Sequence, residues 1–189
     1  MLSLLYTREH LFHAMERRHQ FRLTKAMIYS ADNSLYAVER LQSTPLPRER
    51  SLLVFDCDLQ HSECRQKIFI GIMETDSVGI APHSPGIGVS VCLQTGLITD
   101  VINNLGVIGY LENVEEALDM HVRIEVEIIG RVYLPRLIIG GDIILHPALY
   151  LDAQSELTAL VGTSMLPRGD ARFLNPRLSM HRENGVAVA

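Results

Sequence analysis

The 189-residue chain is 47% hydrophobic and 21% charged, a composition that excludes a disordered protein and suits one folded domain with a substantial core. No stretch approaches the roughly 18 unbroken apolar residues of a membrane-spanning helix, and the apolar run in MLSLLYTREH is too short for a signal peptide. Three cysteines fit reduced thiols better than a disulfide scaffold. We therefore expect a cytoplasmic protein without a membrane partner.

The net charge of −5 is unevenly distributed along the chain. Residues 51–161 carry five Lys and Arg against fifteen Asp and Glu, a net charge of −10, whereas both ends of the chain are basic. An acidic central region would repel the phosphates of a nucleic acid. The charge pattern therefore argues against a nucleic-acid partner.

The first segment, residues 1–20, is expected to be helical. In TREHLFHAMERRH, Leu11 and Met15 fall on the same helical stripe as Leu4, and Thr7 can cap the helix. We expect this segment to precede the main domain.

Residues 21–165 show a succession of β signals that predicts one sandwich domain. Stretches of β-branched and alternating residues recur with turn signals between them. The expected strands are FRLTKAMIYS, SLYAVERL, LLVFDCDL, QKIFIGIME, IGVSVC, LITDVI, LGVIGYL, HVRIEVEIIG, VYLPRLII and DIILHPALYL, with a short helical turn in NVEEALD. Because strands do not alternate with long helices, the expected fold class is mainly β, an antiparallel β-sandwich.

The stretch HSPGIGVSVCLQTG, residues 83–96, has the glycine content of a nucleotide-binding loop. A dinucleotide fingerprint needs a third glycine, where this chain has Val91, and a helix that begins there. The residues from Val89 to Leu93 instead alternate with period two, and Gly96 suits the left-handed position of a three-residue hairpin loop. We interpret the stretch as a strand and a hairpin.

Two segments alternate between apolar and charged residues, as expected for strands with one buried face. In LLVFDCDL the outward pair is Asp56 and Asp58. In HVRIEVEIIG we expect Ile124, Val126 and Ile128 in the core. The residues expected on its exterior are Arg123, Glu125 and Glu127. Replacing Glu125 by glutamine would then change stability by no more than about 0.5 kcal/mol.

The last segment, residues 166–189, is rich in Pro, Arg and Asn and lacks apolar periodicity. We expect it to be a loosely ordered tail that is dispensable for folding. The adhesion tripeptide that begins at Arg168 is interpreted as a coincidence of composition.

Candidate metal and catalytic groups are incomplete. Cys57, His61 and Cys64 lie within eight residues, but a structural zinc site needs four ligands, so we expect no metal and no cofactor. Glu125 and Glu127 could form the carboxylate pair of a glycosidase, but a neighbouring arginine favours a solvated sheet exterior. The chain also lacks a nucleophile elbow, a P-loop and a metalloprotease helix. The sequence favours a non-catalytic protein.

The order of elements in residues 50–150 resembles the concanavalin A-like sandwich, in particular its SPRY-type members. LLVFDCDL, IFIGIME and IGVSVCLQTG follow one another as the strand, the glycine-bearing strand and the hairpin do in those domains. HVRIEVEIIG and LPRLIIGG suit the later strands. The resemblance implies a jelly-roll sandwich, and some members of this class hydrolyse glycosides.

The expected function is recognition of a protein or peptide partner through end loops or a sheet face. A sandwich gathers its loops at its ends, where binding residues are commonly found. The candidate ligand-binding residues are Asp76, His83, Asn103, Asn104 and Tyr110. The alternatives are a carbohydrate-recognition module, a glycoside-active enzyme, and a structural protein that assembles through strand edges, and the pattern also allows a homo-oligomer.

Overall fold

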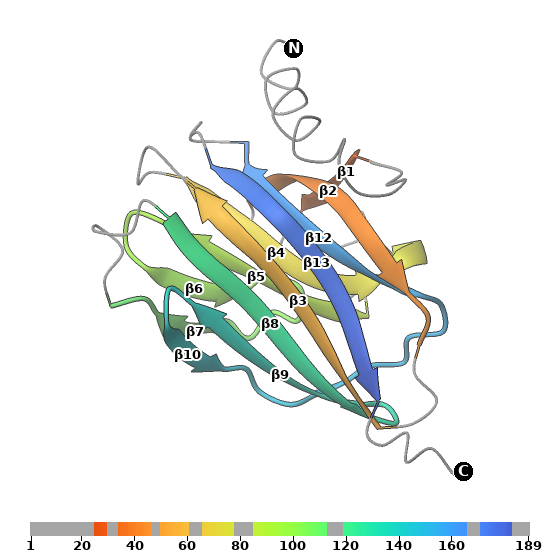
Figure 1. Cartoon of the computed structure of the whole chain (residues 1–189). Coiled ribbons are helices and arrows are strands. Elements are labelled where there is room, and N and C mark those ends of the chain that lie inside the picture. The colour runs from red at the N-terminus through yellow and green to blue at the C-terminus, as the bar shows by residue number, and fades with distance from the viewer. Residues whose placement is uncertain are drawn as a thin grey trace.

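The computed structural model describes residues 25–29, 34–46, 50–60, 66–77, 85–112, 119–165 and 171–182. These residues form two antiparallel sheets packed face to face (Figure 1). The expected N-terminal helix, the helical turn after residue 112, and the residues His83, His61 and Cys64 lie outside the described residues. No helix in the described part of the chain is long and apolar enough to cross a membrane.

The first sheet has seven strands in the order β1-β2-β12-β4-β5-β6-β7. Their bounds are β1 Lys25–Tyr29, β2 Leu35–Thr44, β12 Leu157–Ser164, β4 Lys67–Glu74, β5 Gly86–Cys92, β6 Leu97–Asp100 and β7 Gly106–Tyr110. A short 3-10 helix, Thr75–Ser77, follows β4. The late strand β12 therefore lies between two early ones.

The second sheet has six strands, five of them in the order β10-β9-β8-β3-β13, and β11 also pairs with β9. Their bounds are β10 Asp142–Leu145, β9 Val132–Ile139, β8 Asp119–Ile129, β3 Ser51–Gln60, β13 Arg172–Arg182 and β11 Leu149–Tyr150. In Figure 1 the long strands β3, β8 and β13 run side by side across the front of the molecule.

The main core lies between the two sheets and contains the apolar residues that alternation assigned to it. Ile124, Val126 and Ile128 of β8 are buried there, as are Cys57 and its apolar neighbours on β3. Burial raises the pKa of the Cys57 thiol to about 12, with the nearby Asp58 and Asp56 charges adding to the effect. The strand and face predictions for both segments are confirmed.

The hairpin predictions are also confirmed. Gly96 adopts a φ of 71°, and its N–H donates to the carbonyl of Cys92 over 2.8 Å. The glycine-rich stretch forms β5, in which a Cβ on Gly88 would lie 2.4 Å from Cγ1 of Ile102. This glycine is required for close packing within the protein rather than for a cofactor.

The C-terminal residues differ from the expected loose tail, because residues 172–182 form β13 along the edge of β3. Phe173 and Leu178 are both buried in the core. They are an odd number of positions apart, which in a regular strand would place them on opposite faces. The register shifts between Leu174 and Arg177, where Asn175 has a φ of 51°. This β-bulge turns both apolar side chains inward and hides the period-two pattern from the sequence.

Candidate functional site

Part of the outer face of the seven-stranded sheet is buried within the protein. Along β4, Ile68, Ile70 and Ile72 belong to the main core, whereas Phe69 and Met73 belong to a second cluster on the opposite face. The members of this second cluster, each at most 1% exposed, are Ile28, Tyr36, Val38, Phe69, Met73, Val101, Ile102 and Leu160. A ligand cannot contact these buried side chains in the folded protein.

A buried hydrogen bond fixes the second cluster. The Tyr36 hydroxyl donates to Oγ of Ser90 over 2.7 Å, although these residues lie on β2 and β5, which are separated by two strands. The Tyr36 ring packs against Phe69 with ring centroids 5.7 Å apart. Of the two outer sheet faces, the one on the six-stranded sheet is therefore the candidate for binding.

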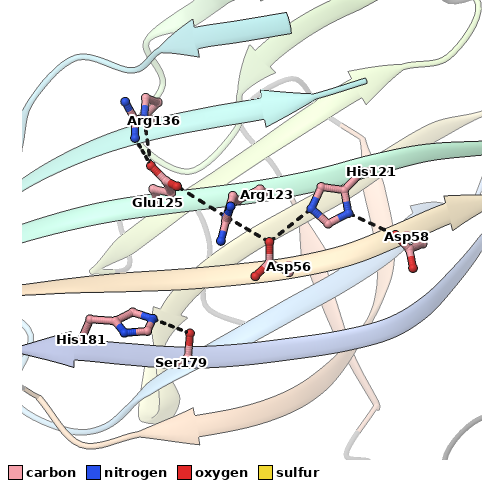
Figure 2. Close-up of polar contacts among 8 residues, drawn as sticks. All are labelled: Asp56, Asp58, His121, Arg123, Glu125, Arg136, Ser179 and His181. Carbon is pink, nitrogen blue, oxygen red and sulfur yellow. Dashed lines mark hydrogen bonds and ion pairs between the residues drawn. The ribbon is translucent and has the colours of Figure 1, made fainter. Parts of the chain in front are cut away.

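The outer face of the six-stranded sheet carries a connected array of charged side chains, shown in Figure 2. Nε of Arg136 donates to Oε2 of Glu125 over 2.9 Å, and Nε of Arg123 lies 3.4 Å from the other oxygen of that carboxylate. Nε of Arg123 also lies 3.0 Å from Oδ1 of Asp56. We call the residues Asp56, Asp58, His121, Arg123, Glu125 and Arg136 the polar array.

The array follows from the register of three neighbouring strands. Asp56 and Asp58 of β3 are directly opposite Arg123 and His121 of β8, and Glu125 of β8 is opposite Arg136 of β9. Cross-strand partners share a face, so alternating charged residues on three strands form one surface. On β13, Oγ of Ser179 lies 3.2 Å from Nε2 of His181, apart from the array in this view (Figure 2).

His121 joins the two aspartates of β3. Its Nδ1 lies 3.0 Å from Oδ1 of Asp58, and its Nε2 lies 3.2 Å from Oδ1 of Asp56. His121 thus links two carboxylates of β3 from its place on the neighbouring strand β8. Hydrogen bonds from His121 and from Asn175 hold the pKa of the Asp58 carboxyl below its usual value.

Glu125 faces outward as predicted, but it is not solvated. Its side chain is only 11% exposed because the guanidinium groups of Arg123 and Arg136 cover it. The small effect expected for a glutamine at this position therefore no longer follows. Glu127, the other member of the suggested glycosidase pair, accepts a hydrogen bond from Nε of Arg50 over 2.7 Å.

The predicted loop residues do not form one site. Asn103 donates through Nδ2 to the carbonyl of Gly86 over 3.1 Å, and the exposed residues Asn104 and Asp76 lie at the same end of the seven-stranded sheet. Tyr110 is opposite Leu97, at the other end of the β6–β7 hairpin. Of the four predicted loop residues that the structure describes, only the two asparagines and Asp76 thus share an end of the sandwich.

A buried aspartate and histidine that the sequence analysis missed support this end. Oδ2 of Asp100 lies 2.7 Å from Nε2 of His146, and both side chains are fully buried. Asp100 also accepts the backbone N–H of Asn103 over 2.6 Å. Since Asp100 belongs to β6 and His146 follows β10, the pair joins the two sheets. An isolated aspartate and histidine carry no sequence signal for such pairing.

Replacing Asp100 by alanine should destabilise the protein by about 1–3 kcal/mol, because the buried Nε2 of His146 and the N–H of Asn103 lose their hydrogen-bond partner. Burial raises the pKa of Asp100, but hydrogen bonds from His146 and Asn103 outweigh it, so the pKa is lowered overall. A lowered pKa contributes stability above the unfolded-state pKa, and this contribution is lost as pH falls through the folded-state value. Urea unfolding of the wild-type and Asp100→Ala proteins from pH 7 downward should therefore show that the difference between their free energies of unfolding becomes smaller in acid.

The exposed Asp152→Ala change is the matched control, with an expected effect of no more than about 1 kcal/mol. Equal effects of the two substitutions at pH 7, or a difference that grows in acid, would contradict the structural role of Asp100.

A scan against protein-family models finds no match, nor does a search of curated protein sequences. Among solved structures, the chain is similar to a seed lectin of Lotus tetragonolobus, with a TM-score of 0.51 and 10% identity over 88% of this chain and 96% of that one. It is also similar to lectin I of Ulex europaeus in complex with the methyl glycoside of α-L-fucose, with a TM-score of 0.54 and 8% identity over 84% and 91% of the two chains.

The carbohydrate recognition domain of Emp47p matches with a TM-score of 0.54 and 8% identity over 89% of this chain and 92% of that one. The fold is a lectin-type β-sandwich. At such low identity the likeness shows the fold alone. It confirms the expected concanavalin A-like class, but it does not confirm the SPRY type.

Within the described residues of this sandwich, no group of three or more histidine, cysteine or acidic side chains is arranged to hold a metal ion. The polar array is a set of hydrogen-bonding groups on a sheet face. In this array the guanidinium groups donate hydrogen bonds and the carboxylates accept them.

Proposed function

We propose that this protein is a carbohydrate-recognition module that binds sugar through the polar array. The proposal replaces the expected protein or peptide partner. The comparisons with solved structures contradict that expectation, because the three structures cited above are two lectins and a carbohydrate recognition domain.

The observation that carries the proposal is the fixed array on the exposed outer face of the six-stranded sheet. A sugar presents neighbouring hydroxyl groups, each able to donate and to accept a hydrogen bond. The carboxylates of Asp56 and Asp58 accept, and the guanidinium groups of Arg123 and Arg136 donate in a planar geometry. The face thus offers both kinds of partner to one sugar ring.

The contacts within the array also reduce the cost of binding. Long charged side chains lose rotamer freedom when a ligand orders them, and each immobilised side chain costs about 0.5–1.5 kcal/mol. Here the side chains already hold one another, and they stand on strands rather than on loops. A preorganised array of this kind suits a neutral, strongly hydrated ligand such as an oligosaccharide.

The test is a glycan array, followed by calorimetry with the best-binding glycan on Asp56→Ala and Asp76→Ala proteins. Losing charge-assisted hydrogen bonds of about 1.5–3 kcal/mol should weaken binding by Asp56→Ala roughly tenfold or more. The matched change at Asp76, in the end loops, should leave the affinity unchanged. Thermal unfolding of both variants confirms that the fold is intact.

Two results would contradict the proposal. One is the absence of any glycan bound above background by the folded protein. The other is weakened binding by Asp76→Ala with an unchanged affinity for Asp56→Ala, which would move the site to the loops.

A further inference from the structure

A tyrosine at the margin of the outer face of the six-stranded sheet is exposed to solvent. Tyr150 is 68% exposed, although it belongs to a strand and is opposite Val132 of β9. Val132 is in turn opposite Ile129 of β8, so the three side chains form one row on the outer face. Both neighbours are themselves exposed, and the ring thus stands beside a small apolar surface.

The position of this ring is fixed by its surroundings. The N–H of Leu151 donates to the carbonyl of Arg131 over 3.0 Å, which attaches the end of β11 to the β8–β9 turn. Nη1 of Arg131 donates to the Tyr150 hydroxyl over 3.4 Å and lies 3.2 Å from Oδ1 of Asp152. One guanidinium therefore bridges the hydroxyl group and the carboxylate.

This combination matches the two faces of a pyranose. The C–H groups of a sugar ring form an apolar surface that can lie flat against an aromatic ring, while its hydroxyl groups project from the rim. Tyrosine supplies a rigid aromatic surface with few rotatable bonds. Beside it, Arg131 has donors and Asp152 has acceptors for the hydroxyl groups at the rim.

The distance to the polar array defines the size of the ligand. Val132, opposite Tyr150, and Arg136 of the array are four residues apart on β9. At about 3.3 Å per residue this separation is roughly 13 Å, which exceeds the width of a single sugar ring. A monosaccharide cannot contact both places at once.

We infer that Tyr150, Arg131 and Asp152 form a second sugar subsite, and that the ligand is an oligosaccharide spanning from it to the polar array. The inference rests on the proposed function and adds the class of ligand. Occupying two linked subsites raises affinity through effective concentration, so binding should strengthen with chain length until both are filled.

The experiment measures affinity for a series from the monosaccharide to the tetrasaccharide of the best-binding glycan. Tyr150→Ala should weaken binding of the tetrasaccharide roughly three- to tenfold, the range for an aromatic contact, and leave the monosaccharide unaffected. Tyr150→Phe keeps the ring and should retain most of the affinity. Tyr110→Ala is the matched control, since Tyr110 is 64% exposed but lies on β7 of the other sheet.

The outcomes separate this inference from the proposed function. If Asp56→Ala weakens binding but Tyr150→Ala matches the wild type at every chain length, the second subsite is wrong and the function stands. An equal loss for all chain lengths in Tyr150→Ala would overturn the two-subsite ligand. If no glycan binds at all, the proposed function fails and the subsite with it.

Discussion

A Val126→Asp protein is expected not to fold. Val126 is 1% exposed in the core between the sheets, opposite Leu53 on one side and Pro135 on the other. An aspartate there would bury a carboxylate among apolar side chains, at a cost of several kcal/mol. Since the whole stability of a domain is about 5–15 kcal/mol, circular dichroism should show loss of the native β spectrum.

The control for this change is Leu134→Asp on the neighbouring strand. Leu134 is 38% exposed on the outer face, so an aspartate there stays in contact with water. Because Glu127 is opposite this position on β8, we expect a loss of up to about 1 kcal/mol in the free energy of unfolding from the two like charges. A folded Val126→Asp protein would show that the two faces of β8 have been assigned the wrong way round.

Truncation of the chain after residue 170 is expected to impair folding about as severely as Val126→Asp does. The change removes the buried Ala171 and all of β13, including its buried residues Phe173 and Leu178. It also leaves one edge of β3 without the strand that pairs with it from Ser51 to Gln60. An open edge of this length promotes aggregation, so the product should be insoluble or melt far more than about 5 °C lower.

Ending the chain after Arg182 keeps every described contact of β13 and is the control for this truncation. Differential scanning fluorimetry of the two proteins makes the comparison. A soluble product ending at residue 170 with an unchanged melting temperature would mean that β13 is not part of the stable sandwich.

Local patterns were sufficient to predict most strands and turns. Alternation identified the inward faces of β3 and β8, because one side of each strand packs on the core and the other carries charge. Gly96 predicted the hairpin loop between β5 and β6, and it has a positive φ of 71°. These features depend only on neighbouring residues.

Two strands escaped prediction for opposite reasons. No strand was assigned over residues 157–164, because β12 lies in the middle of its sheet and is buried on both faces, so it shows no alternation. In β13 the pattern exists but is interrupted by the bulge before Arg177. Burial by distant strands and a local register shift are properties that composition does not reveal.

The candidate site could be predicted only in part. The sequence placed Asp56, Asp58 and Arg123 on an exterior face, but it did not show that β3 and β8 are neighbours. It also gave no sign that Tyr36 and the rest of the second cluster are buried on the outer face of the other sheet. Charged alternation reveals which side of a strand faces outward, while only the tertiary structure shows which outward face stays open.

The most direct test of the carbohydrate proposal is to map the binding face by NMR. The backbone amides of the isotope-labelled protein would be followed while the best-binding oligosaccharide is added. We predict that the largest shift changes fall on β3, β8 and β9, around Asp56, Arg123 and Arg136, and extend to Tyr150. Changes confined to the loop around Asn103 and Asn104, with none on those three strands, would contradict it.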